Sequence, residues 1–268
     1  TYTYIGGMPK IIAQYRETKS MIESRSLQIQ IIEAYKADFP KYGRRLNLER
    51  LGRVFESSAT HLAKKVKFQE IDSHSKAREV RKSIELLLQA RILFACNHCE
   101  VSAPPLWATE DPEIFKLYFL DIGLVNAIHG LDPMSLEKEF NNHFETKGFI
   151  AEQIVAQHLI SFYGLALSPR LNFWLRDKGA HKGEIDFLVQ QNNEIIPIEV
   201  KASASGHLKS LFHFSKDKKL SKAIKISTNP FLIKDASHML EGQAYKIKLM
   251  EVPIYAVELL SSLIFKYF

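Results

Sequence analysis

Two stretches of alternating sequence, residues 184–190 and 194–201, constrain the fold of this chain most strongly. Each alternates apolar with polar residues, which is the period of a β-strand that buries one face. The apolar positions are Ile185, Phe187, Val189, Ile196, Ile198 and Val200. Because only Gln191-Asn192-Asn193 separates the stretches, we predict an antiparallel hairpin. Pro197, inside the second stretch, indicates a sheet edge or an irregularity there.

The other face of this hairpin carries two acids. Asp186 and Glu199 are 13 residues apart, and pairing about a turn near residue 192 makes them neighbours. Adjacent carboxylates repel unless a cation lies between them, and Mg²⁺ or Mn²⁺ prefers such oxygen ligands. Lys201 lies on the same face, where it could hold a water or a phosphate oxygen beside the metal. The alternative is a set of surface ion pairs in which Lys201 bridges to Glu199.

The composition is that of a globular protein. The 268 residues are 46% hydrophobic and 25% charged, and no apolar run approaches the ~18 residues of a transmembrane helix. The N-terminus lacks the features of a signal peptide, and two cysteines cannot build a disulfide framework. We therefore expect a cytoplasmic protein that does not engage a membrane. Because the first residue is not Met, we also expect it to be part of a longer protein.

The net charge of +6 is distributed unevenly. Residues 40–82 contain 12 Lys or Arg and 5 Asp or Glu, and residues 200–234 contain 8 Lys and a single acid, Asp217. Residues 92–147, between these blocks, contain 3 basic and 9 acidic side chains. Two basic blocks are typical of surfaces that bind a polyanion such as DNA. The alternative is that both are simply solvated faces of helices.

The first half of the chain is predicted to be mainly helical. Apolar spacing predicts helices over residues 20–38, 47–64, 75–91 and 112–129. Between the last two we expect a strand at residues 92–95, a turn at Asn97-His98 and a second strand ending at Pro104-Pro105. This order resembles a winged helix, whose last helix enters the DNA major groove. A helical packing or protein-docking unit is the alternative.

Basic side chains around the start of helix 75–91 are the candidates for DNA contact. They are Lys76, Arg78, Arg81 and Lys82. We place a domain boundary in the turn that begins at Leu131, which gives a helical, winged-helix-like domain over 1–135 and a second domain over 136–268.

The second half mixes helices and strands. Helices are predicted over residues 147–163 and 207–219, and strands over residues 171–175, 184–190, 194–201 and 223–226. The resulting order, αβββαβ, places the chain in the α+β or α/β class. Arg176, Lys182 and Lys209 flank the acidic pair and are candidates for phosphate contact. Cys96 and Cys99 lack the further ligands of a zinc site and are interpreted as structural thiols.

The acidic hairpin and the helix before it resemble the PD-(D/E)XK nuclease superfamily. The matching segments are Glu152, Gly183-Glu184-Ile185-Asp186 and Ile198-Glu199-Val200-Lys201. The resemblance implies a restriction-endonuclease-like αβββαβ core in which Asp186 and Glu199 bind Mg²⁺ or Mn²⁺. It further implies that Glu152 is an accessory ligand that assists catalysis and that Lys201 polarises the attacking water.

A wider resemblance covers nearly the whole chain. The chain is similar to the C-terminal region of a bacterial and archaeal family of AAA-type ATPases, a domain of unknown function with a PD-(D/E)XK-like core. The segments that carry it are Gly6–Pro9, Ala37–Tyr42, Phe115–Leu124, Gly148 with Glu152, Phe173-Trp174 and Glu184–Ser203. It implies an N-terminal ATPase module as partner. No Gly-x₄-Gly-Lys-Ser/Thr occurs in this chain, so ATP would act only through that module.

Two classes of function follow. The first is a metal-dependent nuclease module of an ATPase-coupled protein, with DNA as its partner and Asp186, Glu199 and Lys201 as its chemical groups. The second is a catalytically inactive nuclease fold that docks a protein partner or regulates the ATPase. Membrane-surface binding is disfavoured because the apolar stripe of helix 75–91 must be buried in the protein.

Overall fold

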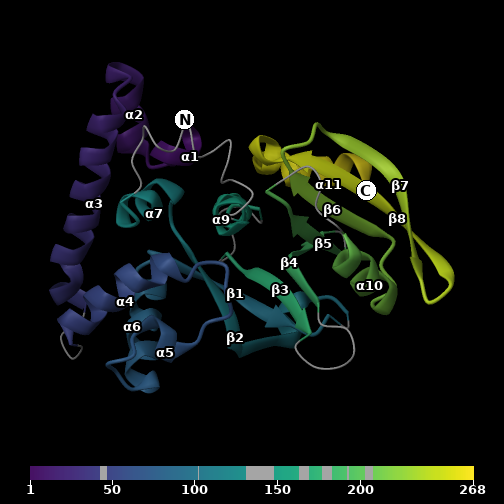
Figure 1. Cartoon of the computed structure of the whole chain (residues 1–268), viewed down its shortest axis with the longest axis horizontal. Helices are drawn as coiled ribbons and strands as arrows, with labels where there is room; N and C mark the ends of the chain where they lie inside the picture. Colours follow the sequence, from purple (N-terminus) through teal and green to yellow (C-terminus); the bar gives the residue numbers. More distant parts are fainter. Residues whose placement is uncertain are drawn as a thin grey trace. The chain divides into compact units, whose positions relative to one another are not determined.

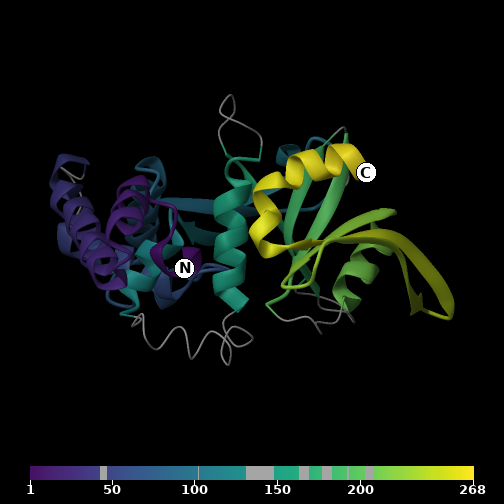
Figure 2. The same cartoon turned by 90° about the horizontal axis from the view of Figure 1, so that it is seen from above.

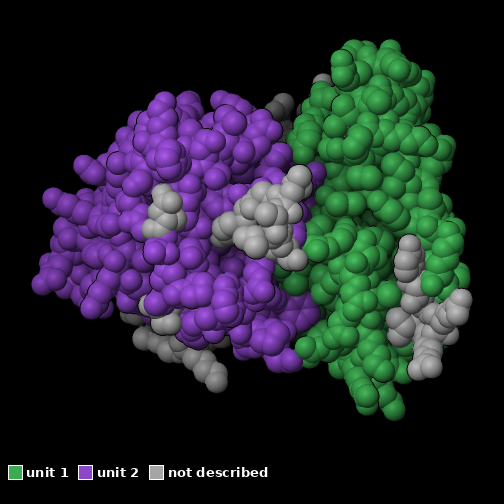
Figure 3. Space-filling view, turned by 180° about the vertical axis from the view of Figure 1, so that it is seen from behind, with its two compact units in different colours: residues 1–95, 116–143 green, residues 96–115, 144–268 purple. Residues whose placement is uncertain are grey.

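The computed structural model describes residues 1–42, 47–101, 103–130, 148–162, 169–176, 183–191, 193–202 and 208–268. Two compact units make up the chain (Figure 3). Unit 1 comprises Thr1–Ala95 and Lys116–His143, and unit 2 comprises Cys96–Phe115 and Phe144–Phe268. The expected boundary between residues 135 and 136 falls outside the described residues. Within those residues, each helix is too short or too polar to cross a bilayer.

Unit 1 is built mainly of helices. They are α1 (Tyr2–Ile5), α2 (Pro9–Thr18), α3 (Met21–Tyr42), α4 (Leu48–Thr60), α5 (Phe68–Ile71), α6 (Ala77–Gln89) and α7 (Ile122–Ile128). The Asn47 side chain accepts a hydrogen bond from the Arg50 N–H and so begins α4. On α6, the apolar stripe that the sequence predicts is buried at Val80, Ile84 and Leu87.

The region after α6 differs from the prediction. β1 (Leu93–Cys99) runs straight through the expected turn at Asn97-His98. The second strand does not end at Pro104-Pro105: the short helix η1 (Leu106–Thr109) intervenes, and β2 (Glu110–Phe119) replaces the first part of the predicted helix 112–129. The last five residues of β2, Phe115–Phe119, are all buried, Lys116 included, so this segment is a strand covered on both sides rather than one stripe of a helix.

Asp121 holds the first residues of the chain against α7. Its carboxylate accepts hydrogen bonds from the N–H groups of Gly7, Gly123 and Leu124 at 2.6, 2.8 and 3.2 Å. Gly6 has a φ of 75°, and a Cβ there would lie 2.0 Å from Asp121 Oδ1. Only glycine therefore fits at Gly6.

Unit 2 is organised around a mixed sheet. Its order is β2-β1-β3-β4-β5-β6-β8-β7. The remaining strands are β3 (Leu171–Arg176), β4 (Gly183–Gln191), β5 (Glu194–Val200), β6 (Lys222–Ser227), β7 (Leu232–Leu240) and β8 (Gln243–Pro253). The hairpin β4–β5 is antiparallel, as predicted, whereas β5, β6 and β8 run parallel to one another.

Helices cover both faces of this sheet. They are α9 (Gly148–Leu159), α10 (Lys209–Asp217), η3 (Ile254–Leu259) and α11 (Leu260–Tyr267). α10 packs on one face, while η3 and α11 lie on the opposite face together with α9 (Figures 1 and 2). From α9 to β6 the order is helix, three strands, helix, strand, which is the order the sequence predicts for this half.

The irregularity suggested by Pro197 lies elsewhere. Pro197 pairs with Leu188 of β4 in regular register, so it marks no bulge, and the ladder between β5 and β6 begins only at the next residue, Ile198. The shift in register occurs instead between β3 and β4, opposite Asp186. Consistent with it, Ile185 and Leu188 belong to the same buried cluster although strict alternation would put them on opposite faces.

Candidate functional site

The β4–β5 hairpin brings the two predicted acids together. Phe187 pairs with Ile198, and continuing this register places Asp186 directly opposite Glu199. Both acids lie just beyond the last pair of the β4–β5 ladder, close to the bulge between β3 and β4. Bulges are frequent beside functional sites because the extra residue changes the direction of a side chain.

Glu199 is a buried carboxylate with a bonding partner at only one of its two oxygens in the described part of the chain. Its residue is 5% exposed, and Oε1 lies 2.5 Å from Lys201 Nζ. Oε2 is buried and has no hydrogen-bond partner among the described residues. Burial raises the pKa of Glu199 to about 8, with a further increase from the charge of Asp186, against the lowering effect of Lys201.

Asp186 and Lys201 are both fixed by the backbone around Glu199. Asp186 Oδ2 accepts a hydrogen bond from the Val200 N–H at 2.7 Å. The Lys201 N–H donates to the Ile226 carbonyl of β6 at 2.8 Å. Burial disfavours the charged form of Lys201, but Glu199 and then Asp186 outweigh it and raise the pKa of the ammonium group. Lys201 is therefore a fixed cation at neutral pH.

Glu152 projects from α9, which packs on β5. Its charge contributes to the raised pKa of Glu199, so the three acids lie within electrostatic range of one another. Within the residues the structure describes, however, no three His, Cys, Asp or Glu side chains are close enough to form a metal-binding group.

The donor set around Glu199 fits a hard cation held by two carboxylates. The unpartnered Glu199 Oε2 and the adjacent Asp186 supply oxygen ligands. Mg²⁺ commonly uses one or two carboxylates and completes its shell with water and substrate phosphate. Glu152 fits as an outer electrostatic neighbour better than as a third direct ligand.

A row of charged side chains extends from Glu199 across the sheet. In the backbone register, Glu199 lies opposite Lys225 of β6, and Lys225 lies opposite Glu251 of β8. Ile195, Ala223 and Leu249, which precede the three charged residues by four, two and two positions, belong to a buried cluster that also contains residues of α10. Because side chains an even number of residues apart share a face of a strand, the charged row lies on the α10 face of the sheet. Lys225 and Glu251 are each only 5% exposed.

Both oxygens of the Glu251 carboxylate accept hydrogen bonds, unlike those of Glu199. Its Oε1 accepts from Lys234 Nζ at 2.6 Å and its Oε2 from the Asn229 amide at 3.0 Å, while Lys225 Nζ lies 3.8 Å from Oε2. Burial alone would raise the pKa of Glu251. The bonds from Lys234 and Asn229 and the charge of Lys225 outweigh it, and the pKa is lowered.

The sequence analysis missed this extension of the site. Lys225 and Glu251 are each flanked by apolar residues, in Ile-Lys-Ile and Met-Glu-Val. A charge inside an apolar strand is a signal that could have identified them, because such charges are seldom buried unless they are paired. Their mutual contact depends on β6–β8 pairing, which local pattern cannot give.

The basic residues of α6 are presented to solvent. Lys76, Arg78 and Lys82 are exposed at the N-terminal half of the helix. Among the described parts of the chain their side chains have no hydrogen bond or ion pair, whereas Arg81 bonds Glu85 at 3.3 Å. Three of the four predicted DNA contacts are thus unpaired cations on one helix.

The other candidates for phosphate contact differ from one another. Arg176 is paired with Asp217, and its guanidinium lies 5.0 Å from the centre of the Trp174 ring. Lys209 is exposed at the first position of α10. Lys182 lies outside the described residues.

The two cysteines are buried thiols of β1. Cys96 and Cys99 are both 0% exposed, and Cys99 Sγ donates to the Phe173 carbonyl at 3.8 Å. Burial raises the pKa of Cys99 to about 12, with a smaller contribution from Glu110. These thiols are structural groups in the sheet.

Comparison with known families assigns the two halves of the chain. Residues 1–135, just over half of the sequence, match the family described as "Domain of unknown function (DUF8612)". The chain belongs to this family. Residues 147–250 match a second one, "Domain of unknown function (DUF4143)". In this DUF8612 protein, the exposed cations of α6 lie in the first match, and Glu152, Asp186, Glu199 and Lys201 all lie in the second.

Other comparisons add little. A search of curated proteins finds no match to the DUF8612 protein. Among solved structures it is similar to "Crystal structure of protein VC1899 from Vibrio cholerae", with 12% sequence identity and a TM-score of 0.26. The similarity covers 98% of this chain and 57% of that one, so the chain spans little more than half the length of the solved protein.

Proposed function

We propose that unit 2 carries a divalent-metal-dependent site for phosphodiester hydrolysis, with DNA as substrate. The observation that carries this proposal is the buried Glu199 carboxylate, which has an unpartnered oxygen, a raised pKa and Asp186 opposite it. A cation bound between two buried carboxylates would offset their mutual repulsion and the cost of burying their charge.

The proposed chemistry assigns a role to each residue of the site. Asp186 and Glu199 hold the metal, which when bound would activate a water and neutralise charge on the phosphate. Lys201 stays protonated, since its pKa is raised, so it donates a hydrogen bond to the water or to a phosphate oxygen and does not act as a base. Glu152 adds negative charge that favours the cation. The αβββαβ order and these residues support a PD-(D/E)XK-like core.

We also propose that the N-terminal half of the chain binds DNA through a winged-helix-like element. Its parts follow α4: a bridge between Lys65 and Lys116, then α5, α6 and the strands β1 and β2. The exposed cations of α6 would contact phosphates, so affinity should fall steeply with salt. The departure from a simple wing is that β1 also pairs with β3, in parallel.

We propose further that the chain acts with a AAA-type ATPase module. The DUF4143 match over residues 147–250 supports this, because that domain is commonly associated with such ATPases.

The nuclease proposal is tested by incubating the protein with plasmid and linear DNA in Mg²⁺ or Mn²⁺. Cleavage is expected for the wild type and is expected to be lost in Asp186→Asn and Lys201→Ala. Asp235→Asn is the matched control, because Asp235 is an exposed acid of β7 in the same unit. Absence of cleavage by the wild type with both metals would refute the nuclease proposal.

One observation favours a second function, a non-catalytic docking or regulatory module. The Lys201 ammonium is already engaged by Glu199 Oε1, and no three-residue metal group is found in the described ranges. If Mn²⁺ binds at Glu199 but DNA is not cut, this second function is favoured. Calorimetry with Mn²⁺ on wild type and Glu199→Gln, combined with the cleavage assay, therefore separates the two.

A further inference from the structure

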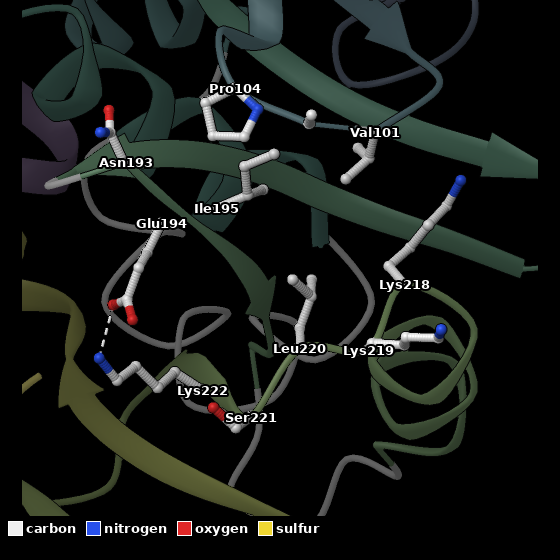
Figure 4. A pocket seen from close by; sticks show the side chains of 11 residues that line it. Val101, Pro104, Asn193, Glu194, Ile195, Lys218, Lys219, Leu220, Ser221 and Lys222 are labelled. Carbon is white, nitrogen blue, oxygen red and sulfur yellow. Dashed lines mark hydrogen bonds and ion pairs between the residues drawn. The ribbon is translucent and has the colours of Figure 1, made fainter.

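A pocket of about 250 Å³ lies at the opposite end of β5 from Glu199 (Figure 4). It is enclosed by the start of β5, the segment that joins α10 to β6, and residues near η1. The lining residues are Val101, Ala103, Pro104, Asn193, Glu194, Ile195, Lys218, Lys219, Leu220, Ser221 and Lys222. Glu194 is five residues before Glu199, which corresponds to about 17 Å along a strand. The pocket is thus separate from the acidic site.

Positive charge gathers at one side of this pocket. Lys218 and Lys219 extend from the same side, with their ammonium groups directed away from Leu220, and the ion pair of Lys222 with Glu194 lies on the other side (Figure 4). Lys219 is exposed, and its side chain has no bonded partner within the described part of the chain. Lys218 Nζ donates only to a neutral group, the Glu100 carbonyl, at 2.8 Å. Within the described residues, neither ammonium group forms an ion pair with a carboxylate.

The wall between these two sides is apolar. Ile195 and Leu220 lie between the lysine pair and the ion pair, with Val101 and Pro104 above them (Figure 4). Ile195 is 7% exposed and Val101 4% exposed, and both belong to one buried hydrophobic cluster of unit 2. A ligand with an anionic end and a flat apolar body would match this arrangement.

Three lining residues have a positive φ. Val101, Asn193 and Lys219 have φ angles of 32°, 63° and 57°, in the left-handed region. For Val101, a β-branched residue, such a value is a genuine outlier. Strained residues of this kind cluster at ligand-binding sites, where the surrounding structure holds them in place.

We propose that this pocket binds a small phosphorylated molecule with a ring-shaped body, of the class of a nucleoside monophosphate. The phosphate lies between Lys218 and Lys219, and the ring packs on Ile195 and Leu220. Asn193 and Ser221 offer hydrogen bonds to its polar edges. This site goes beyond the proposed nuclease activity and does not depend on it.

Isothermal titration of the whole chain with adenosine monophosphate tests the site. Adenosine and inorganic phosphate are titrated separately, since each contains half of the proposed chemistry. Adenosine monophosphate is expected to bind at least about tenfold more tightly than either, because only it engages both the lysines and the apolar wall.

Two variants assign the binding to the lysine pair. Lys218→Gln and Lys219→Gln are each expected to weaken adenosine monophosphate binding about tenfold. Lys246→Gln, an equal change of charge at an exposed residue of β8 outside the pocket, is expected to leave it unchanged. Asp186→Asn is also expected to leave it unchanged, so a failure of the nuclease proposal is distinguishable from a failure here.

Several results would overturn the proposal. They are no heat of binding with millimolar adenosine monophosphate, equal affinity for inorganic phosphate, or unchanged affinity in both lysine variants. Thermal unfolding of each variant in the absence of ligand is expected to match the wild type, because Lys219 is exposed and Lys218 makes a single bond to a carbonyl.

Discussion

Two buried glutamates of the same sheet behave in opposite ways. Glu199 and Glu251 are both 5% exposed and lie two strands apart in one row of charges, with Lys225 between them. The pKa of Glu199 is raised to about 8, and the pKa of Glu251 is lowered. Burial is the largest contribution to the pKa at both residues, but only at Glu251 do hydrogen bonds and nearby cations outweigh it. Glu251 has donors on both oxygens, whereas Glu199 has one cation, nearby acids and an unpartnered oxygen.

This difference separates a structural charge from one that is suited to function. A fully bonded buried carboxylate stabilises a fold only if all its partners remain in place. A buried carboxylate with an open oxygen costs free energy, and such groups cluster at sites that bind a ligand or ion. The experiments below test whether the two glutamates divide in this way.

Removal of Glu251 should have the largest effect. Glu251→Ala leaves Lys225, itself 5% exposed, without that carboxylate, and we expect a loss of about 3–5 kcal/mol in the free energy of unfolding. Glu199→Gln, measured in EDTA at neutral pH, should instead increase this free energy, because it removes a charge that its surroundings disfavour. Urea denaturation gives both values. Equal losses would contradict the comparison.

Metal binding should produce the next largest effect. Mn²⁺ at a hundredfold excess over its Kd should stabilise the wild type by about 3 kcal/mol. Glu199→Gln should lose this gain, while Glu251→Gln, although less stable, should keep it. Thermal unfolding with and without Mn²⁺ measures the gain in each protein. A gain that persists in Glu199→Gln would place the metal elsewhere.

The two glutamates should also respond oppositely to pH. In EDTA, folded Glu199 holds its proton up to a pKa of about 8, so its contribution to stability falls as pH rises above the ordinary value of 4.5. We expect a slope of about 1 kcal/mol per pH unit relative to Glu199→Gln. The lowered pKa of Glu251 has the opposite effect on the free energy of unfolding. The stabilising contribution of Glu251 is present above pH 4.5 and is lost as the pH falls through the pKa of the folded state. Unfolding curves from pH 3.5 to 8.5 would show both trends.

Weakening one partner of Glu251 should have the smallest effect. The Lys234 side chain is 44% exposed, so its ion pair is screened by water. Lys234→Met should therefore cost less than about 1 kcal/mol, and the cost should shrink further in high salt. Lys246→Met, on the neighbouring strand, is the matched control. A larger loss would mean that Lys234 alone determines the lowered pKa of Glu251.

Local periodicity predicted the β4–β5 hairpin, and with it the Asp186–Glu199 pairing, because both strands alternate and the turn between them is short. It failed for β2, whose apolar residues are buried on both faces and therefore show the spacing of a helix. The bulge opposite Asp186 arises from pairing between β3 and β4, which no single stretch of sequence encodes.

The rest of the site is non-local. The strands β7 and β8 were not predicted, so the partners of Lys225 could not be named. Lys225 and Glu251 meet only because β6 and β8 run parallel, 26 residues apart in sequence. The burial that raises the pKa of Glu199 comes likewise from the packing of whole elements. The sequence alone identified Asp186 and Glu199 but did not indicate that Glu199 has a carboxylate oxygen without a hydrogen-bond partner in the described part of the chain.

The buried thiols of β1 supply the protein with an internal reporter. Cys96 and Cys99 are shielded from solvent, and the pKa of Cys99 is about 12, so thiol reagents should not modify them while the sheet is intact. Labelling then proceeds only as fast as this part of the sheet opens. A mass increase followed over time would thus read the opening kinetics directly, without an added probe.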